Sequence, residues 1–123
     1  MGLIDFKTAV FIKKFGYNNS SYKEYWGDGK LHDFIDRYTA AALLNKRFYS
    51  AITYFEVVEW LWETGIAFIS YSRFGNNFCK PRIRYNDKVY EFKSVSLRTP
   101  QEAYEFAVLK LIDIVKEEKE LAL

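Results

Sequence analysis

The sequence is poor in the residues that hold small folds together by covalent or metal bonds. Cys79 is the only cysteine and His32 the only histidine among 123 residues. A single thiol cannot form an intramolecular disulfide, nor can it supply the several thiolates of a structural zinc site. We therefore expect a hydrophobic core in a reducing compartment, with no metal ion and no cofactor.

Long apolar runs are also missing. The longest, Ala40–Leu44, has five residues, whereas a membrane-spanning helix needs about 18 or more. Asp5 and the lack of a long apolar run after a basic flank argue against a secretory signal. Because 50% of the residues are hydrophobic and 28% are charged, the composition is that of an ordinary globular chain. It predicts a cytoplasmic protein with no membrane partner, and nothing in it indicates a small-molecule substrate.

The chain has little net charge, but one segment carries an excess of basic residues. The formal net charge of +2 is too small to predict a nucleic-acid partner by itself. Residues 66–98, however, carry seven basic residues against two acidic ones, a balance of +5. Residues 1–65 are neutral and residues 99–123 have a balance of −3. The basic charge therefore belongs to one segment.

Two capping boxes mark helices in the second half of the chain. Thr53-Tyr54-Phe55-Glu56 precedes an apolar run that stops at Gly65, which predicts a helix over 53–64. Thr99-Pro100-Gln101-Glu102 has an N-cap hydroxyl, a proline at the first helical position and a carboxylate at the third. The apolar residues that follow recur at steps of three and four, which predicts a helix over about 100–119.

Between these helices the pattern changes to that of β-structure. Alternating or β-rich segments are separated by turn residues, and Pro81 is compatible with the start or edge of a strand. The expected strands are Ile66–Tyr71, Arg82–Tyr85 and Val89–Val95. We predict an α+β fold in which a three-stranded antiparallel meander is packed by two helices, in the order α-β-β-β-α.

The N-terminal half is expected to be an extension of this unit. Apolar spacing predicts a helix over 4–15 that ends at Gly16, and residues 17–30 resemble a loop. Residues 31–44 fit either a helix or a strand. The whole chain is near the commonest domain size, so we expect one domain, with residues 1–50 as a helical extension and loop and residues 51–123 as the α-β-β-β-α unit.

The predicted order over residues 53–119 resembles the double-stranded RNA-binding domain. That family binds A-form RNA through its first helix, a loop between strands and a lysine-rich start of the last helix. Here the last helix begins Thr99-Pro100-Gln101-Glu102-Ala103, and the first carries Glu56, Glu59 and Glu63. The resemblance therefore implies a topology without the RNA-binding residues of the family.

Three short motifs resemble small uncharacterised proteins encoded by bacteriophages and mobile elements. They are Ala51-Ile52-Thr53, Glu59-Trp60-Leu61 and Thr99-Pro100-Gln101-Glu102-Ala103. The chain departs from that pattern by having Ile52 where proline is common. The resemblance implies a phage-type origin and a bacterial host cytoplasm, but no activity and no site.

Catalytic motifs are weak. Cys79 and His32 would be the only nucleophile and base pair, yet they share no motif. Glu91-Phe92-Lys93 has the E-x-K form of metal-dependent nucleases, with Asp87 as a conceivable second carboxylate, but the spacing is short. We predict no catalytic residue and no metal ligand.

Aromatic residues supply the leading functional hypothesis. With 11 Phe, 10 Tyr and 3 Trp, they make up 20% of the chain, and aromatic side chains are enriched at protein interfaces. We expect a non-catalytic, phage-type accessory protein that binds another protein or its own copies. The alternative for the loop over 17–26, that Tyr22 and Trp26 fold back over a sheet or helix, stays open. The candidate binding residues are Tyr17, Tyr22, Tyr25, Trp26, Trp60 and Trp62.

The basic segment supplies the alternative function, nucleic-acid binding by a β-hairpin within residues 73–98. Arg82 and Arg84 are two residues apart, so they would project from one face of a strand. The opposing interpretation is a solvated face on which Arg82 or Arg84 pairs with Glu91. The candidate residues are Arg73, Lys80, Arg82, Arg84, Lys88 and Lys93.

Overall fold

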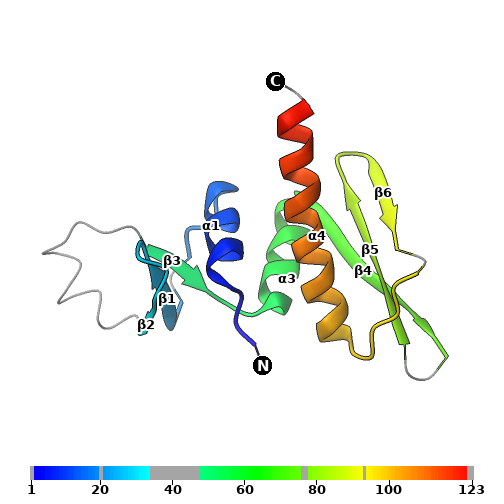
Figure 1. The fold of residues 1–123 in the computed structure, drawn as a ribbon, viewed down its shortest axis with the longest axis horizontal. Coiled ribbons are helices and arrows are strands. Elements are labelled where there is room, and N and C mark those ends of the chain that lie inside the picture. Colours follow the sequence, from blue (N-terminus) through cyan, green and yellow to red (C-terminus); the bar gives the residue numbers. More distant parts are fainter. Residues whose placement is uncertain (1, 20, 34–47, 76–77, 93, 122–123) are drawn as a thin grey trace, which may run out of the picture. The chain divides into compact units, whose positions relative to one another are not determined.

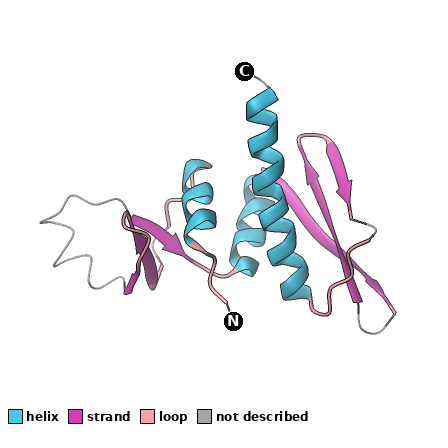
Figure 2. Cartoon of the chain, in the orientation of Figure 1, coloured by secondary structure: helices cyan, strands magenta, loops and turns pink. Residues whose placement is uncertain are grey.

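The computed structural model divides the chain into two compact units, residues 1–53 and 54–123. Each unit combines helix with sheet (Figures 1 and 2), so the predicted α+β class is confirmed. The boundary between the two units lies close to the expected boundary between residues 50 and 51. That the two units form a single domain stays a prediction. The structure describes residues 2–19, 21–33, 48–75, 78–92 and 94–121.

The first unit opens with helix α1 (Phe6–Lys14). Asp5 caps this helix, because its carboxylate accepts a hydrogen bond of 2.8 Å from the backbone N–H of Thr8. Lys13 and Lys14 lie in the last turn, where positive charge is favourable. The chain leaves the helix through Gly16, whose φ of +103° suits glycine. The predicted first helix is therefore confirmed.

The first unit also contains a three-stranded antiparallel sheet in the order β2-β1-β3. Its strands are β1 (Lys23–Trp26), β2 (Leu31–Asp33) and β3 (Phe48–Ala51). The expectation of a loop over 17–30 was wrong for β1. That strand lacks β-branched residues, and its ladder with β3 is a long-range pairing that local sequence patterns do not register. The first unit therefore contains a sheet in addition to the predicted helix and loop.

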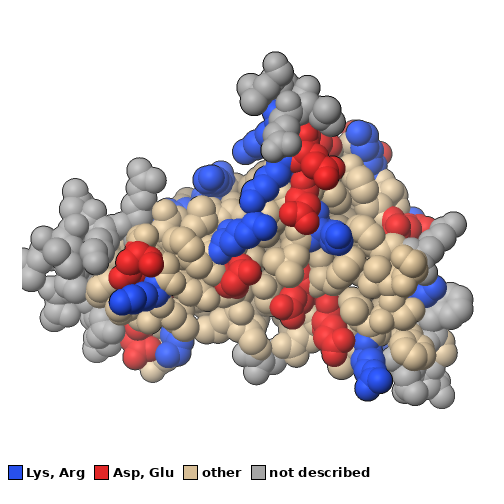
Figure 3. All heavy atoms as spheres, in the orientation of Figure 1, with Lys and Arg blue, Asp and Glu red and all other residues tan. Residues whose placement is uncertain are grey.

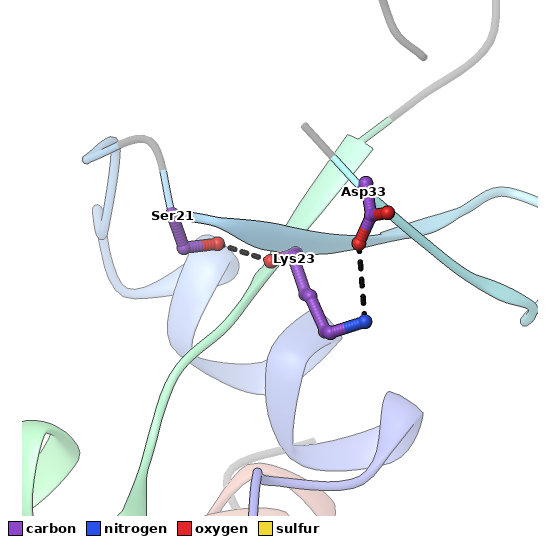
Figure 4. Close-up of polar contacts among 3 residues, drawn as sticks. All are labelled: Ser21, Lys23 and Asp33. Atoms are coloured by element: carbon purple, nitrogen blue, oxygen red, sulfur yellow. Dashed lines mark hydrogen bonds and ion pairs between the residues drawn. The ribbon is translucent and has the colours of Figure 1, made fainter. Parts of the chain in front are cut away.

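The β1–β2 register is marked by an ion pair. Lys23 lies opposite Asp33, and its Nζ is 3.0 Å from the Asp33 carboxylate (Figure 4). The Ser21 hydroxyl donates to the carbonyl of Lys23 and accepts from the N–H of Ala51. Leu31–Asp33 is thus a strand, and the rest of the ambiguous segment, 34–44, lies outside the described residues.

The second unit has the predicted α-β-β-β-α order. Helix α4 begins as expected, because the Thr99 hydroxyl accepts from the N–H of Glu102 at 3.1 Å. Gly65, with a φ of +72°, follows α3. The strands form an antiparallel sheet in the order β4-β5-β6. The elements are α3 (Tyr54–Thr64), β4 (Ala67–Phe74), β5 (Phe78–Tyr85), β6 (Lys88–Glu91) and α4 (Pro100–Leu121).

Pro81 lies inside the central strand β5, not at a strand start or an edge strand as predicted. The ladder with β6 ends at the Arg82–Glu91 pair, and the next contact on that side is the bridge between Cys79 and Leu97. Cys79 exchanges both backbone hydrogen bonds with Leu97. By strand alternation, the missing N–H of Pro81 faces the gap between these two contacts. The proline therefore interrupts no ladder bond.

The two faces of this sheet differ in character. One face is covered by α3 and α4 (Figure 1), and its row includes the buried residues Ile69, Cys79 and Ile83. The helices contribute the buried side chains of Leu61 and Leu111 to this core. The opposite face, here called the outward face, carries mostly exposed or half-buried side chains. It consists of Phe68, Ser70, Ser72, Phe78, Lys80, Arg82, Arg84, Val89 and Glu91.

Candidate functional site

Three basic side chains form a row along the outward face. Lys80, Arg82 and Arg84 alternate with buried residues of β5, whose burial pattern has period two. At roughly 3.4 Å per residue, the Cα atoms of successive basic residues are about 7 Å apart along the strand. Phe78 continues the same row and is 47% exposed. The strand thus presents a basic row that ends in an aromatic ring.

Neighbouring strands flank the cationic row with hydroxyls and one carboxylate. Ser70 lies opposite Arg82, and Ser72 lies opposite Lys80. On the other side, Glu91 lies opposite Arg82. Neither serine was predicted as a site residue, because uncharged residues in β4 carry no charge signal. Only the two-residue alternation of that strand could have placed them on this face.

A hollow of about 480 Å³ crosses the three strands at this point. Within it, Arg82 Nε is 3.5 Å from Glu91 Oε1, and both side chains are about half exposed. The predicted cross-strand pairing of Arg82 with Glu91 is therefore confirmed. The hollow is lined by Ser70, Tyr71, Ser72, Lys80, Pro81, Arg82, Glu91 and Phe92.

The remaining basic candidates do not join this row. Arg73 and Lys88 lie opposite Cys79 and Tyr85, and so belong to the alternate row of each strand, on the helix-covered side. Lys93 lies outside the described residues. The structure thus brings together Lys80, Arg82 and Arg84 and separates Arg73 and Lys88 from them.

The aromatic candidates of the first unit are mostly used in packing. The Tyr25 hydroxyl donates to the carbonyl of Ile4 at 2.8 Å, and its ring meets Phe6 edge to face. Trp26 is only 8% exposed and stacks on His32 with ring centroids 3.7 Å apart. Tyr17 is half-buried, whereas Tyr22 is 81% exposed. These contacts favour the alternative in which the aromatics fold back, with Tyr22 as the exception.

The two tryptophan candidates of α3 are two residues apart, so they lie on different sides of the helix. Trp62 is 50% exposed, and its indole Nε1 donates to the carbonyl of Ile69 at 2.9 Å. Its ring also packs edge to face against Phe68. Trp60 is half-buried. Trp62 thus covers part of the free edge of β4.

Raised tyrosine pKa values reflect packing. Burial raises the pKa of Tyr25, and the nearby Asp5 carboxylate adds to the shift. Burial and then Glu118 raise the pKa of Tyr85, whereas burial and then Tyr71 raise that of Tyr104. None of these three tyrosines belongs to the outward face.

The catalytic alternatives find little geometric support. Cys79 is a buried thiol in β5, and His32 is stacked on Trp26 in the other unit. Asp87 lies in the β5–β6 turn with a φ of +65°, while Glu91 faces Arg82. Within the part of the chain that the structure describes, no three His, Cys, Asp or Glu side chains are grouped to hold a metal ion.

Among the described helices, none combines the length and the apolar character needed to cross a membrane.

Comparisons with protein-family models, curated proteins and solved structures found no match. The resemblance to phage-encoded proteins therefore stays a prediction, and the outward face is the surface from which a function must be argued.

Proposed function

We propose that this protein is a non-catalytic binding protein that holds single-stranded nucleic acid on the outward face of its second sheet. The observation that supports this proposal is the row of Lys80, Arg82 and Arg84 along one strand. Proteins that bind single strands combine such a cationic track with aromatic rings on which bases stack. Phe78 and the half-buried Phe68 supply rings on the same face.

The spacing of the row suits an extended strand. Side chains on one face of a strand are spaced about 7 Å apart. This spacing is of the same order as the distance between neighbouring phosphates in an extended nucleic acid. Arginine is well suited to phosphate, because its planar fork donates several hydrogen bonds at once. The two serine hydroxyls beside the row add neutral donors.

Protein binding by a phage-type accessory protein is the second candidate function. It is favoured by the 81% exposure of Tyr22 and the 50% exposure of Trp62, because large exposed aromatics are typical of interfaces. In either case we propose that the protein acts in the cytoplasm of a bacterial host, as the resemblance to phage proteins implies.

Charge reversal on the row tests the leading proposal. The full-length Arg82→Glu/Arg84→Glu variant and the wild type are titrated against labelled single-stranded oligonucleotides by fluorescence anisotropy. For about three phosphate contacts, wild-type affinity should fall roughly 20-fold between about 50 and 200 mM salt. The variant should lose most of its affinity, and that salt dependence with it.

The chain offers a matched control. Arg73→Glu/Lys88→Glu makes the same change in net charge on the alternate row of the same sheet, in the neighbouring strands β4 and β6. It should bind nearly as the wild type does, apart from a modest effect of net charge. Equal losses in the two variants would show that overall charge, not the outward face, governs binding, and the proposal would then be wrong.

A further inference from the structure

One residue of the outward face does not suit a surface that binds phosphates alone. Glu91 carries a negative charge into the hollow beside Arg82. A carboxylate next to a phosphate track repels the ligand and lowers its affinity. As a half-exposed ion pair, Glu91–Arg82 contributes little to the stability of the fold. The position of Glu91 is therefore better explained by a ligand group that a carboxylate can bind.

The chemistry of the hollow indicates which group this is. Glu91 is an acceptor, and Ser70 and Ser72 supply hydroxyls on the opposite side of β5. Arg82 lies between them and contacts Glu91 through Nε, which is one of the five N–H donors of a guanidinium. A ligand that carries both an anionic group and a hydrogen-bond donor, such as a hydroxyl, fits this set of side chains. A ribonucleotide unit has both, whereas a deoxyribonucleotide within a strand lacks the 2′-hydroxyl.

The size of the hollow is compatible with such a unit. Its volume of about 480 Å³ falls in the range of roughly 300–1,000 Å³ of pockets that accept small organic ligands. Phe92 and Tyr71 contribute to its lining. The hollow therefore has room for a sugar with part of its base, next to a phosphate contact at Arg82.

Resting on the proposed function, we infer that the ligand of the outward face is single-stranded RNA, and that Glu91 accepts a hydrogen bond from a ribose 2′-hydroxyl. The neighbouring phosphate contacts Arg82, and the strand continues along β5 over Lys80 and Arg84. The 2′-hydroxyl is the group by which proteins distinguish RNA from DNA at a given position. Glu91 is thus assigned as a specificity-determining residue, not a catalytic one.

The test compares oligomers of uridine, deoxyuridine and 2′-O-methyluridine of equal length, titrated against the full-length protein at one salt concentration. A hydrogen bond to a charged acceptor contributes about 1.5–3 kcal/mol, so RNA should bind at least about tenfold more tightly than DNA. The 2′-O-methyl strand, which cannot donate, should bind as weakly as DNA or more weakly.

Glu91→Val removes the acceptor and keeps a residue that favours a strand. In this variant DNA affinity should rise, because repulsion is lost, and the ratio of RNA to DNA affinity should fall to near one. Asp87→Asn is the control: it removes one carboxylate from the β5–β6 turn, outside the hollow, at a positive φ that asparagine tolerates. It should leave the ratio unchanged. Circular dichroism and thermal melting establish that both variants are folded.

The possible failures are distinguishable. Equal binding of RNA and DNA by the wild type, or an unchanged ratio in Glu91→Val, would overturn the RNA assignment and leave the proposed function standing. Tighter binding of duplex RNA than of the single strand would overturn it as well. Absence of binding by every oligomer would overturn both the inference and the proposed function.

Discussion

At the scale of single residues, the aromatic side chains show how burial separates structural from functional candidates. Tyr25 and Trp26 belong to the same short strand as charged residues, yet their rings pack within the first unit. Tyr22 lies just before that strand and is 81% exposed. From composition alone all three were predicted as binding residues, because composition does not distinguish a buried ring from an exposed one.

The Tyr25 hydroxyl makes a contact whose loss is measurable. Tyr25→Phe leaves the carbonyl of Ile4 without this donor, and we expect a fall of about 1 kcal/mol in the free energy of unfolding. Urea denaturation of the variant and the wild type measures it. Tyr22→Phe is the control and should change stability little, since its ring is exposed. Equal stability of all three proteins would contradict the assigned role of Tyr25.

The same residue predicts a dependence on alkaline pH. Because burial and Asp5 raise the pKa of Tyr25 in the folded protein, its contribution to stability is complete below the unfolded value of about 10 and is lost as pH rises through the folded value. Tyr25→Phe should therefore lose stability less steeply above about pH 10. An identical alkaline profile in the variant and the wild type would count against this prediction.

At the scale of elements, prediction succeeded where the signals were local. Two capping boxes placed the starts of α3 and α4, since the cap and the helix are adjacent in sequence. The alternation of β5 predicted the face of Arg82 and Arg84. In the first unit, β1 and β3 were missed and β2 was left open between helix and strand, because their pairing is long-range and their residues are mixed in character. The same limit concealed the hollow, which three strands form together.

The edge of β4 supplies a prediction at this scale. Trp62 donates to the carbonyl of Ile69 on the side of β4 away from β5, and an uncovered strand edge favours pairing with another chain. Trp62→Ala should therefore self-associate as protein concentration rises, as measured by light scattering after size-exclusion chromatography. Glu63→Ala, on an exposed position of the same helix, should behave as the wild type. A tryptophan variant of unchanged mass would show that Trp62 does not protect this edge.

At the scale of the whole molecule, the net charge is small, although residues 66–98 carry a local excess of basic residues. The net charge is +2, and acidic and basic side chains are interspersed on the face shown in Figure 3. Long-range attraction of a polyanion is therefore weak, and binding must depend on local contacts. The outward face supplies these with three cations in line and one carboxylate. With only about three phosphate contacts, the affinity for nucleic acid should depend less on salt than that of strongly basic proteins.

The most direct measurement is a titration of the ¹⁵N-labelled full-length protein with single-stranded RNA, followed residue by residue by NMR. We predict that amide shifts change first along β5 and at its neighbours on the outward face, around Ser70, Arg82 and Glu91. The amides of α3 and of the first unit should change little. Shifts centred on Tyr22, or on the helix-covered side of the sheet, would contradict the proposal that the outward face binds nucleic acid.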